Sequence, residues 1–270
     1  MVTMGKAFAV VLTIITTVSV AIFVSRHWWF PEVASAHGGA MDHQFVETFV
    51  GAAIGFILAQ LGLAAFAWKY GERKGETRPI RFFPGGAKWL VVLALVYVGS
   101  EIILLEFVGQ KVWAAMYFTP PAADSLQVQV LAGQFAFYFR YPGPDGKFGP
   151  IHTNKIDETR GNFFGISQSD PESRDDIVTV ELAVPVNKPV ELLLNSKDMG
   201  HGFYVPEMRI QQDIVPGMEI PLHFTPTKIG KYEIACNQLC GLGHNTMRAF
   251  LEVMSEEDYQ KWIVEQASLQ

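Results

Sequence analysis

Three long apolar runs dominate the first 118 residues, and they occupy residues 7–24, 45–68 and 89–109. At about 1.5 Å per residue, each run can cross the roughly 30 Å hydrocarbon core of a bilayer. The second and third runs predict a transmembrane helical hairpin. The first predicts a further transmembrane helix or a secretory signal cleaved near "ASA" at residues 34–36. About ten residues separate the first run from that motif, which favours a retained helix and three transmembrane helices.

Beyond residue 119 the pattern changes to short alternating segments separated by Pro, Gly and Asn. Such segments are typical of strands in a Greek-key sandwich or barrel. The predicted strands are residues 125–139, 177–184, 189–196, 219–224, 231–236 and 247–254. Ser255 and Asp258 have the spacing of a capping box before an amphipathic helix. The turn-rich residues 142–176 predict a solvated loop.

Composition agrees with the membrane segments, and charge indicates on which side of the membrane each part lies. Apolar residues make up 49% of the chain and the mean hydropathy is +0.18, which agrees with membrane segments. Residues 69–88 carry six Lys and Arg, whereas residues 25–44 carry only one. Because positive loops stay inside, the C-terminal part is expected outside the cytoplasm. That part, with 12 basic against 20 acidic residues, does not suit a nucleic-acid-binding protein.

The three predicted parts are a first helix or signal with its external linker, a helical hairpin with a basic loop, and an exported β domain. Their ranges are residues 1–44, 45–118 and 119–270.

Both cysteines of the chain lie in "ACNQLCGLGHNTM", residues 235–247, beside a histidine and a methionine. A disulfide between Cys236 and Cys240 is one interpretation, but closing so short a loop stabilises little and leaves His244 and Met247 unexplained. Thiolate, imidazole and thioether together favour copper. Either one thiol is surplus to a single copper, or both bridge two copper ions. The second case needs another histidine, and His201 follows a predicted strand.

"SKDMGHGFYVPEMRIQQDIVPG" (residues 196–217) and "GKYEIACNQLCGLGHNTMRAFLEV" (residues 230–253), behind a helical hairpin, resemble subunit II of haem-copper cytochrome c oxidase. The resemblance covers residues 45–270 and implies a cupredoxin-like domain with a dinuclear copper A centre. It implies that Cys236 and Cys240 bridge the two copper ions. It further implies His201 and Met247 on one copper, with His244 and the backbone carbonyl of Gln238 on the other.

The resemblance also implies a function. Such a subunit accepts electrons one at a time from cytochrome c or a similar carrier and passes them to haem in the catalytic subunit I, which is accompanied by subunit III. That partner reduces oxygen and pumps protons. A copper A subunit of a nitric oxide reductase is an alternative within the class. A membrane-anchored copper carrier is an alternative from another class, but a carrier should use few and exposed ligands.

Two departures from the family lie in the exported domain, and a glutamate that the family has at the start of the second hairpin helix has no match near residues 88–90. The tryptophan that accepts electrons in the family is replaced by Phe135, and a glutamate that often reaches a magnesium ion is replaced by Gln238. Candidate residues for contact with the electron donor are Phe135, Tyr138, Tyr141, Asp198 and Glu207. Glu101 and Glu106 lie inside the third apolar run, where carboxylates are functional candidates by default. We expect either a proton-related or a structural role for them.

Overall fold

The computed structural model describes residues 3–25, 30–71 and 86–269. Its contacts divide the chain into two units. The helical unit comprises Met1–Pro31 and Asp42–Val112, and the β unit comprises Glu32–Met41 and Trp113–Gln270. The chain therefore enters the β unit twice, before and after the hairpin.

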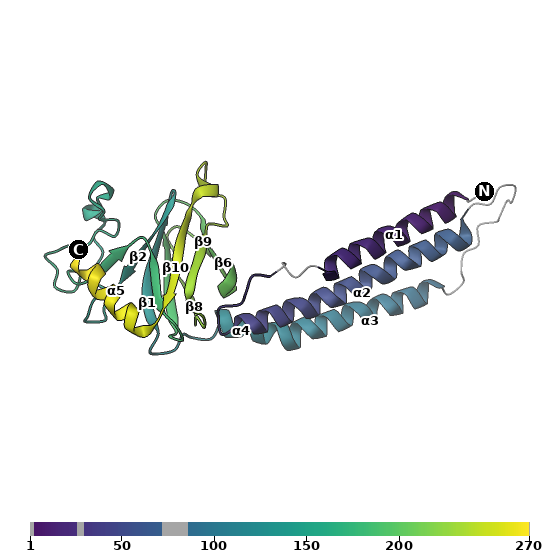
Figure 1. The fold of residues 1–270 in the computed structure, drawn as a ribbon, viewed down its shortest axis with the longest axis horizontal. Coiled ribbons are helices and arrows are strands. Elements are labelled where there is room, and N and C mark those ends of the chain that lie inside the picture. Colours follow the sequence, from purple (N-terminus) through teal and green to yellow (C-terminus); the bar gives the residue numbers. More distant parts are fainter. Residues whose placement is uncertain (1–2, 26–29, 72–85, 270) are drawn as a thin grey trace. The chain divides into compact units, whose positions relative to one another are not determined.

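The long helices are α1 (Met4–Ser25), α2 (Gly38–Tyr70) and α3 (Gly86–Leu104), with a π-helical turn (Leu105–Gly109) and α4 (Gln110–Tyr117) continuing the third helix (Figure 1). The first residues of α2 and the last residues of α4 are counted with the β unit. Three helices of the described chain are long and apolar enough to span a membrane: Met4–Ser25, Gly38–Tyr70 and Lys88–Tyr117. The prediction of three such helices is confirmed. Four basic residues of the predicted cytoplasmic loop, Arg73, Lys74, Arg78 and Arg81, lie outside the described residues.

Small residues on α2 accommodate polar side chains of α3. The Tyr97 hydroxyl donates to the carbonyl of Gly51 at 3.2 Å. The Glu101 carboxylate occupies the space that a side chain at Gly51 would need, and the Tyr97 ring does the same at Gly55. Glu101 is therefore packed between two helices. Glu106, in the π-helical turn, is exposed.

The β unit is a sandwich of two five-stranded sheets, which confirms the predicted cupredoxin-like class (Figure 1). One sheet has the order β3-β2-β1-β5-β8 and the other β4-β10-β9-β6-β7. Strands β1 and β5 are parallel, as are β4 and β10, and the remaining neighbours are antiparallel. The strands are β1 (Leu126–Gly133), β2 (Ala136–Tyr141), β3 (Ile177–Thr179), β4 (Leu182–Pro185), β5 (Val190–Ser196), β6 (His201–Val205), β7 (Ile210–Ile214), β8 (Ile220–Phe224), β9 (Gly230–Ala235) and β10 (Arg248–Met254).

Alternation along the strands fills the space between the sheets. Val128 and Val130 of β1, and Leu192 and Leu194 of β5, are fully buried. Successive side chains of a strand point to opposite faces, so every second residue reaches the core. Helix α5 (Glu256–Ser268) follows the last strand, and the Ser255 hydroxyl caps it by accepting from the backbone N–H of Asp258, as predicted.

Two strand predictions were wrong in detail, and two strands were missed. Residues 125–139 form the hairpin β1–β2, because the chain turns at Gln134 and Phe135. Residues 177–184 divide into β3 and β4, which belong to different sheets, and an apolar run alone does not reveal such a change. Strands β6 and β7 were missed, since Pro206 interrupts the apolar pattern and β7 is polar at its centre.

Residues 142–176 are only partly the solvated loop that we expected. Arg140 of β2 and Asp176, both fully buried in their side chains, form an ion pair. Arg140 also donates to the carbonyl of Gly149 at 2.6 Å and to the side-chain oxygen of Gln129 at 3.0 Å. Phe164 is buried as well. The two ends of the segment are thus fixed to the sandwich, and the loop prediction holds only for its outer residues.

Residues 32–38, here called the strap, run between two turns of the sandwich. The carbonyl of Ala34 accepts from the N–H of Thr227 at 2.7 Å, and the N–H of Ala34 donates to the carbonyl of Glu207 at 2.8 Å. The Ser35 hydroxyl donates to the carbonyl of Met208 at 2.7 Å. Ala34 and Ser35 are almost completely buried. The "ASA" sequence considered as a cleavage motif is therefore an integral part of the folded β unit.

Acid should weaken the strap. Burial lowers the pKa of His37, and the nearby His223 lowers it further, against an opposing effect of the carbonyls of Arg209 and Met208. A histidine whose folded pKa lies below its unfolded value of about 6.5 destabilises the fold as the pH falls through that value. We expect the thermal midpoint of the detergent-solubilised protein, followed by circular dichroism of the β unit, to fall between pH 7.5 and 5.

The variant His37→Gln should show a smaller fall over the same interval, because its amide can still donate to a carbonyl but does not titrate. An equal fall in both proteins would show that His37 does not cause the acid sensitivity.

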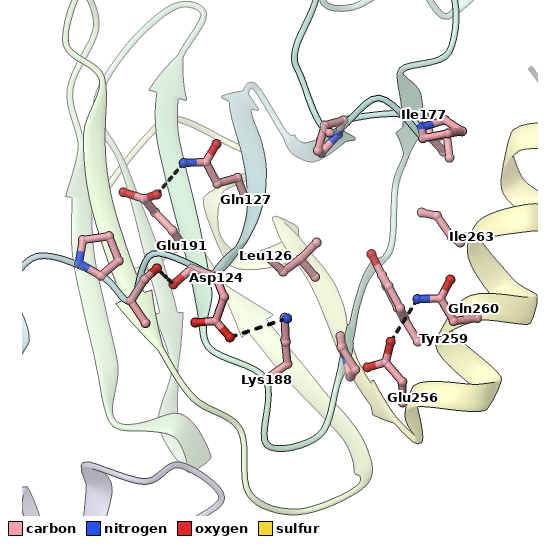
Figure 2. A pocket seen from close by; sticks show the side chains of 18 of the residues that line it. Asp124, Leu126, Gln127, Ile177, Lys188, Glu191, Glu256, Tyr259, Gln260 and Ile263 are labelled. Atoms are coloured by element: carbon pink, nitrogen blue, oxygen red, sulfur yellow. Dashed lines mark hydrogen bonds and ion pairs between the residues drawn. The ribbon is translucent and has the colours of Figure 1, made fainter.

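A pocket opens between α5 and the start of β1 (Figure 2). Its polar side chains are mostly paired with one another: Asp124 with Lys188 at 3.8 Å, and Gln127 with Glu191 at 2.8 Å. Of the residues described as lining it, none is a cysteine, histidine or methionine. The pocket is therefore not the predicted metal site.

Candidate metal centre

Three neighbouring strands bring the predicted metal ligands to one end of the sandwich. His201 opens β6, Cys236 directly follows β9, and Met247 directly precedes β10. Strand β9 lies between the other two and is antiparallel to both, so these three chain positions meet at the same edge. Residues 236–247, here called the metal loop, connect β9 to β10 and carry Cys240 and His244 as well.

The donor atoms of these five side chains are close together. The two thiol sulfurs are 3.7 Å apart. His201 Nδ1 lies 4.0 Å from Cys236 Sγ, whereas His244 Nδ1 and Met247 Sδ each lie 3.7 Å from Cys240 Sγ. His201 and Cys240 are fully buried, and Cys236 and Met247 are nearly so. The structure thus gathers the side chains that the sequence nominated, in a site almost closed to water.

This geometry suits metal ions. Two donors bound at about 2.0–2.3 Å to one tetrahedral metal lie roughly 3.5 Å apart, close to the spacings observed here. Both cysteines are free, and their sulfurs are much farther apart than the roughly 2.05 Å of a disulfide. Two thiols, two imidazoles and a thioether form a soft donor set, of the kind that selects copper.

Gln238 adds a sixth donor through its backbone. Its carbonyl oxygen lies 3.2 Å from Cys236 Sγ and therefore faces the site. Its side chain points elsewhere and donates from Nε2 to Oδ2 of Asp213, on β7, at 2.8 Å. Sequence reasoning anticipated the use of the carbonyl but gave no partner for the side chain.

Asp198 orients His201. His201 Nε2 and Asp198 Oδ1 are 2.7 Å apart, which leaves Nδ1 of the same ring facing the thiols. Partial burial alone would raise the pKa of Asp198, but hydrogen bonds from His201 and from the N–H groups of Gln134 and Met199 outweigh it and lower that pKa. A carboxylate that fixes the second nitrogen of a ligating histidine is a common feature of metal sites. Asp198, proposed from sequence as a docking residue, is thus committed to the site itself.

Comparison with known proteins agrees with this geometry. Residues 167–254 match the family model described as "Cytochrome C oxidase subunit II, periplasmic domain". The alternative cytochrome c oxidase subunit 2 of Bradyrhizobium diazoefficiens is 32% identical over 265 residues, which cover 96% of this chain and 92% of the relative. The chain belongs to the cytochrome c oxidase subunit II family.

Further relatives are similar over much of their length. Cytochrome c oxidase subunit 2 of Thermostichus vulcanus is 42% identical over 260 residues, covering 88% of this chain and 78% of that one. The solved periplasmic domain of subunit II of cytochrome oxidase from Bradyrhizobium japonicum has 22% identity and a TM-score of 0.41, and it covers 55% of this chain and 98% of that one.

The resemblance seen in the sequence is thereby confirmed at the level of the family. As a subunit II, the chain is a membrane-anchored component of an oxidoreductase complex, with its C-terminal domain outside the cytoplasm. Its place beside a catalytic subunit follows from the same membership.

The β1–β2 turn of this subunit II covers the metal loop. Gln134 Nε2 donates to the carbonyl of Cys240 at 2.7 Å. The ring of Phe135 lies directly on Gly241 and Gly243, where any larger residue at Gly243 would collide with it. Phe135 is 39% exposed, and Leu242 beside it in the loop is fully exposed. Phe135 thus lies between the donor cluster and the solvent, where a docking role would place it.

The structure corrects two other docking candidates. Tyr141 is fully buried, and its hydroxyl bonds to both backbone groups of Ala183, so it is not available to a partner. Glu207 lies in the turn after β6, at the far end of that strand from His201, and its carbonyl is bonded to the strap. Tyr138 is half-buried and stacks on Phe163, with ring centroids 3.6 Å apart. Tyr141 shares its face of β2 with the buried Phe137 and Phe139, so alternation along the strand already indicated the core.

Burial affects how the site takes up a metal. Burial and the neighbouring Cys236 raise the pKa of the Cys240 thiol to about 11. The thiol is therefore protonated at neutral pH in the metal-free protein. Because a thiolate is the form that ligates, metal binding must displace this proton.

Proposed function

We propose that this subunit II is the electron-accepting subunit of a respiratory terminal oxidase. It takes electrons singly from cytochrome c at a dinuclear copper A centre and passes them to haem in the catalytic subunit. The observation that carries the proposal is the arrangement of four further donors around two thiol sulfurs 3.7 Å apart. When bound, the copper pair would supply a one-electron carrier with its charge shared between two ions.

The donor positions favour two metal ions over one. Six donors are more than one tetrahedral copper needs. His201 lies on the side of Cys236 and His244 on the side of Cys240, so each imidazole can serve a different ion while both thiolates bridge. The remaining weak donors, Met247 and the carbonyl of Gln238, would complete the two coordination shells, as the family resemblance implies.

The protein's contribution is rigidity. His201 is held by Asp198, and the metal loop is held by Gln134 and covered by Phe135. Side chains locked by packing and hydrogen bonds change little when an electron arrives, which lowers the reorganisation needed for transfer.

The burial of the donor side chains argues against the alternative of a membrane-anchored copper carrier. A carrier must exchange its metal with a partner, whereas His201, Cys240 and Met247 are at most 2% exposed. The nitric oxide reductase alternative is less well supported, because the relatives of this chain are named as cytochrome c oxidases.

We further propose the membrane in which this subunit lies and the proteins that it contacts. Its membrane is the bacterial plasma membrane, with the β unit in the periplasm and subunits I and III as membrane partners. The excess of eight acidic residues in residues 119–270 would attract a basic cytochrome c. Phe135 is the proposed contact residue. Glu101 and Glu106 are proposed to take part in proton movement. Glu101 lies on α3 and packs against Gly51 of α2.

The copper signal and the oxygen uptake of the intact complex test the proposal. We expect a mixed-valence copper signal split by two equivalent copper nuclei, and oxygen uptake supported by reduced cytochrome c. The association rate with cytochrome c should fall as salt rises, because surface charges are screened over about 8 Å at physiological ionic strength. A signal split by a single copper would contradict the dinuclear site. Oxygen uptake that only a quinol supports would contradict the proposed donor.

A further inference from the structure

We propose that Asp213 is a positioning residue for the copper site: it holds the side chain of Gln238 and thereby aims the carbonyl of Gln238 at the metal position. This inference rests on the proposed function, because the carbonyl acts as a ligand only if copper is bound. The assignment goes beyond the sequence, in which Asp213 belongs to no motif that we singled out.

Gln238 is the midpoint of the five residues that include both thiols. Its side chain is exposed, and its hydrogen bond to Asp213 Oδ2, at 2.8 Å, ties the middle of the metal loop to a strand. The carbonyl of the same residue lies 3.2 Å from Cys236 Sγ. One residue thus faces the thiols with its backbone and the sheet with its side chain. Both groups extend from the same Cα, so a hydrogen bond that holds the side chain also restrains the position from which the carbonyl reaches the site.

Asp213 is a firm attachment point. It lies on β7 directly opposite Gly202, which follows the ligand His201 on β6. The next residue, Ile214, is fully buried and fixes this end of β7 in the core. A side chain at Gly202 would collide with Asn237, so the metal loop closes directly on the strand that Asp213 pairs with. The contacts at Gly202 and Asp213 therefore set the distance between the sheet and the metal loop.

The loop needs such an attachment. Beyond Cys240 it contains Gly241 and Gly243, and Gly241 has a φ of +126°, a conformation that other residues rarely adopt. Glycines restrict the backbone little, so the second half of the loop contributes little of its own toward fixing Gln238 in the first half. An amide that donates to a carboxylate makes a charge-assisted hydrogen bond, stronger than one between neutral groups.

Two contributions of Asp213 can be separated by substitution. Asp213→Asn keeps an oxygen acceptor for Gln238 but removes the negative charge. Asp213→Ala removes both. Gln238→Ala removes the donor but keeps a backbone carbonyl at this position. Gln211→Ala, an exposed position on the same strand, serves as the matched control.

The measurements are the copper hyperfine pattern and the reduction potential of the intact complex, and neither requires turnover. We expect Asp213→Ala and Gln238→Ala to change the hyperfine pattern in the same way, and the double variant to change it no more than the larger single change, because both substitutions break one hydrogen bond. Asp213→Asn should keep the wild-type pattern but raise the potential, since a nearby negative charge favours the oxidised site. Gln211→Ala should change neither property.

Asp213→Ala with the wild-type pattern and potential would overturn the inference, and so would additive changes in the double variant. A failure of the proposed function looks different: the wild-type complex itself would then lack a signal from two equivalent copper ions. If a variant lost copper entirely, its circular dichroism would decide between the possibilities. A folded β unit would support the positioning role, and an unfolded one would assign Asp213 to the stability of the sandwich instead.

Discussion

Replacing Cys236 or Cys240 by serine should abolish the dinuclear copper signal of the complex, while the β unit stays folded. Each sulfur has several donor atoms within 4.0 Å, so it is shared by every arrangement that places two metal ions in this site. A serine hydroxyl is a harder and weaker ligand for copper than a thiolate. Electron delivery from cytochrome c should fall by more than about 10³-fold, since the one-electron carrier is lost, and stopped-flow reduction of the haem measures it.

Met247→Leu is the matched control for the serine variants. It removes a thioether that lies 3.7 Å from Cys240 Sγ but leaves both thiolates and both imidazoles. We expect both copper ions to remain and the reduction potential to shift, because a weak axial ligand tunes a copper site without holding it together. An unchanged two-copper signal in Cys236→Ser or Cys240→Ser would refute the bridging role.

Replacing Arg140 by methionine should destabilise the β unit by about 3–5 kcal/mol, the usual cost of removing one partner from a buried ion pair. The carboxylate of Asp176 would then remain buried without its cation. Burial already raises the pKa of Asp176, even though hydrogen bonds from Arg140 and Gly149 oppose that rise. The carbonyl of Gly149 and the side-chain oxygen of Gln129 would lose their donors as well. Urea unfolding of the solubilised subunit, followed by circular dichroism, measures the change.

The double variant Arg140→Met with Asp176→Leu tests the reason for that loss. It removes the buried charge together with its partner, and apolar replacements of buried ion pairs are often tolerated. We expect it to recover a substantial part of the stability that Arg140→Met loses. If the double variant were no more stable than the single one, the uncompensated carboxylate would not be the cause.

Sequence reasoning identified the donor cluster well because most of it lies in one short loop. Neighbouring members of this set, Cys236, Cys240, His244 and Met247, are only three or four residues apart in the sequence. Folding therefore leaves them close together in space. His201 was nominated because a second copper ion needs another histidine and this one follows a predicted strand. The packing of the family's aromatic residues was harder to predict from the sequence. Alternation with Phe137 and Phe139 places Tyr141 on the core face, but only the fold shows that its hydroxyl bonds to Ala183.

Contacts between distant segments were the part that could not be predicted. The pairing of Gln238 with Asp213 joins a loop to a strand that the apolar pattern did not reveal. Asp198 has the appearance of a solvated carboxylate until the ring of His201 is placed beside it. The strap reads as a linker because its partners, such as Thr227, lie almost two hundred residues away. Each of these roles depends on tertiary geometry and has no periodicity to signal it.

The strap has a consequence for biogenesis. Residues 32–38 leave the ribosome before the helical hairpin, yet their hydrogen-bond partners belong to turns near residues 207 and 227. The hairpin is thus an insertion within the folding unit of the sandwich, between its first short piece and its main body. The sandwich therefore reaches its complete form only after both hairpin helices have entered the membrane and the C-terminal part has crossed it. Export of the C-terminal part therefore comes before the last step of folding.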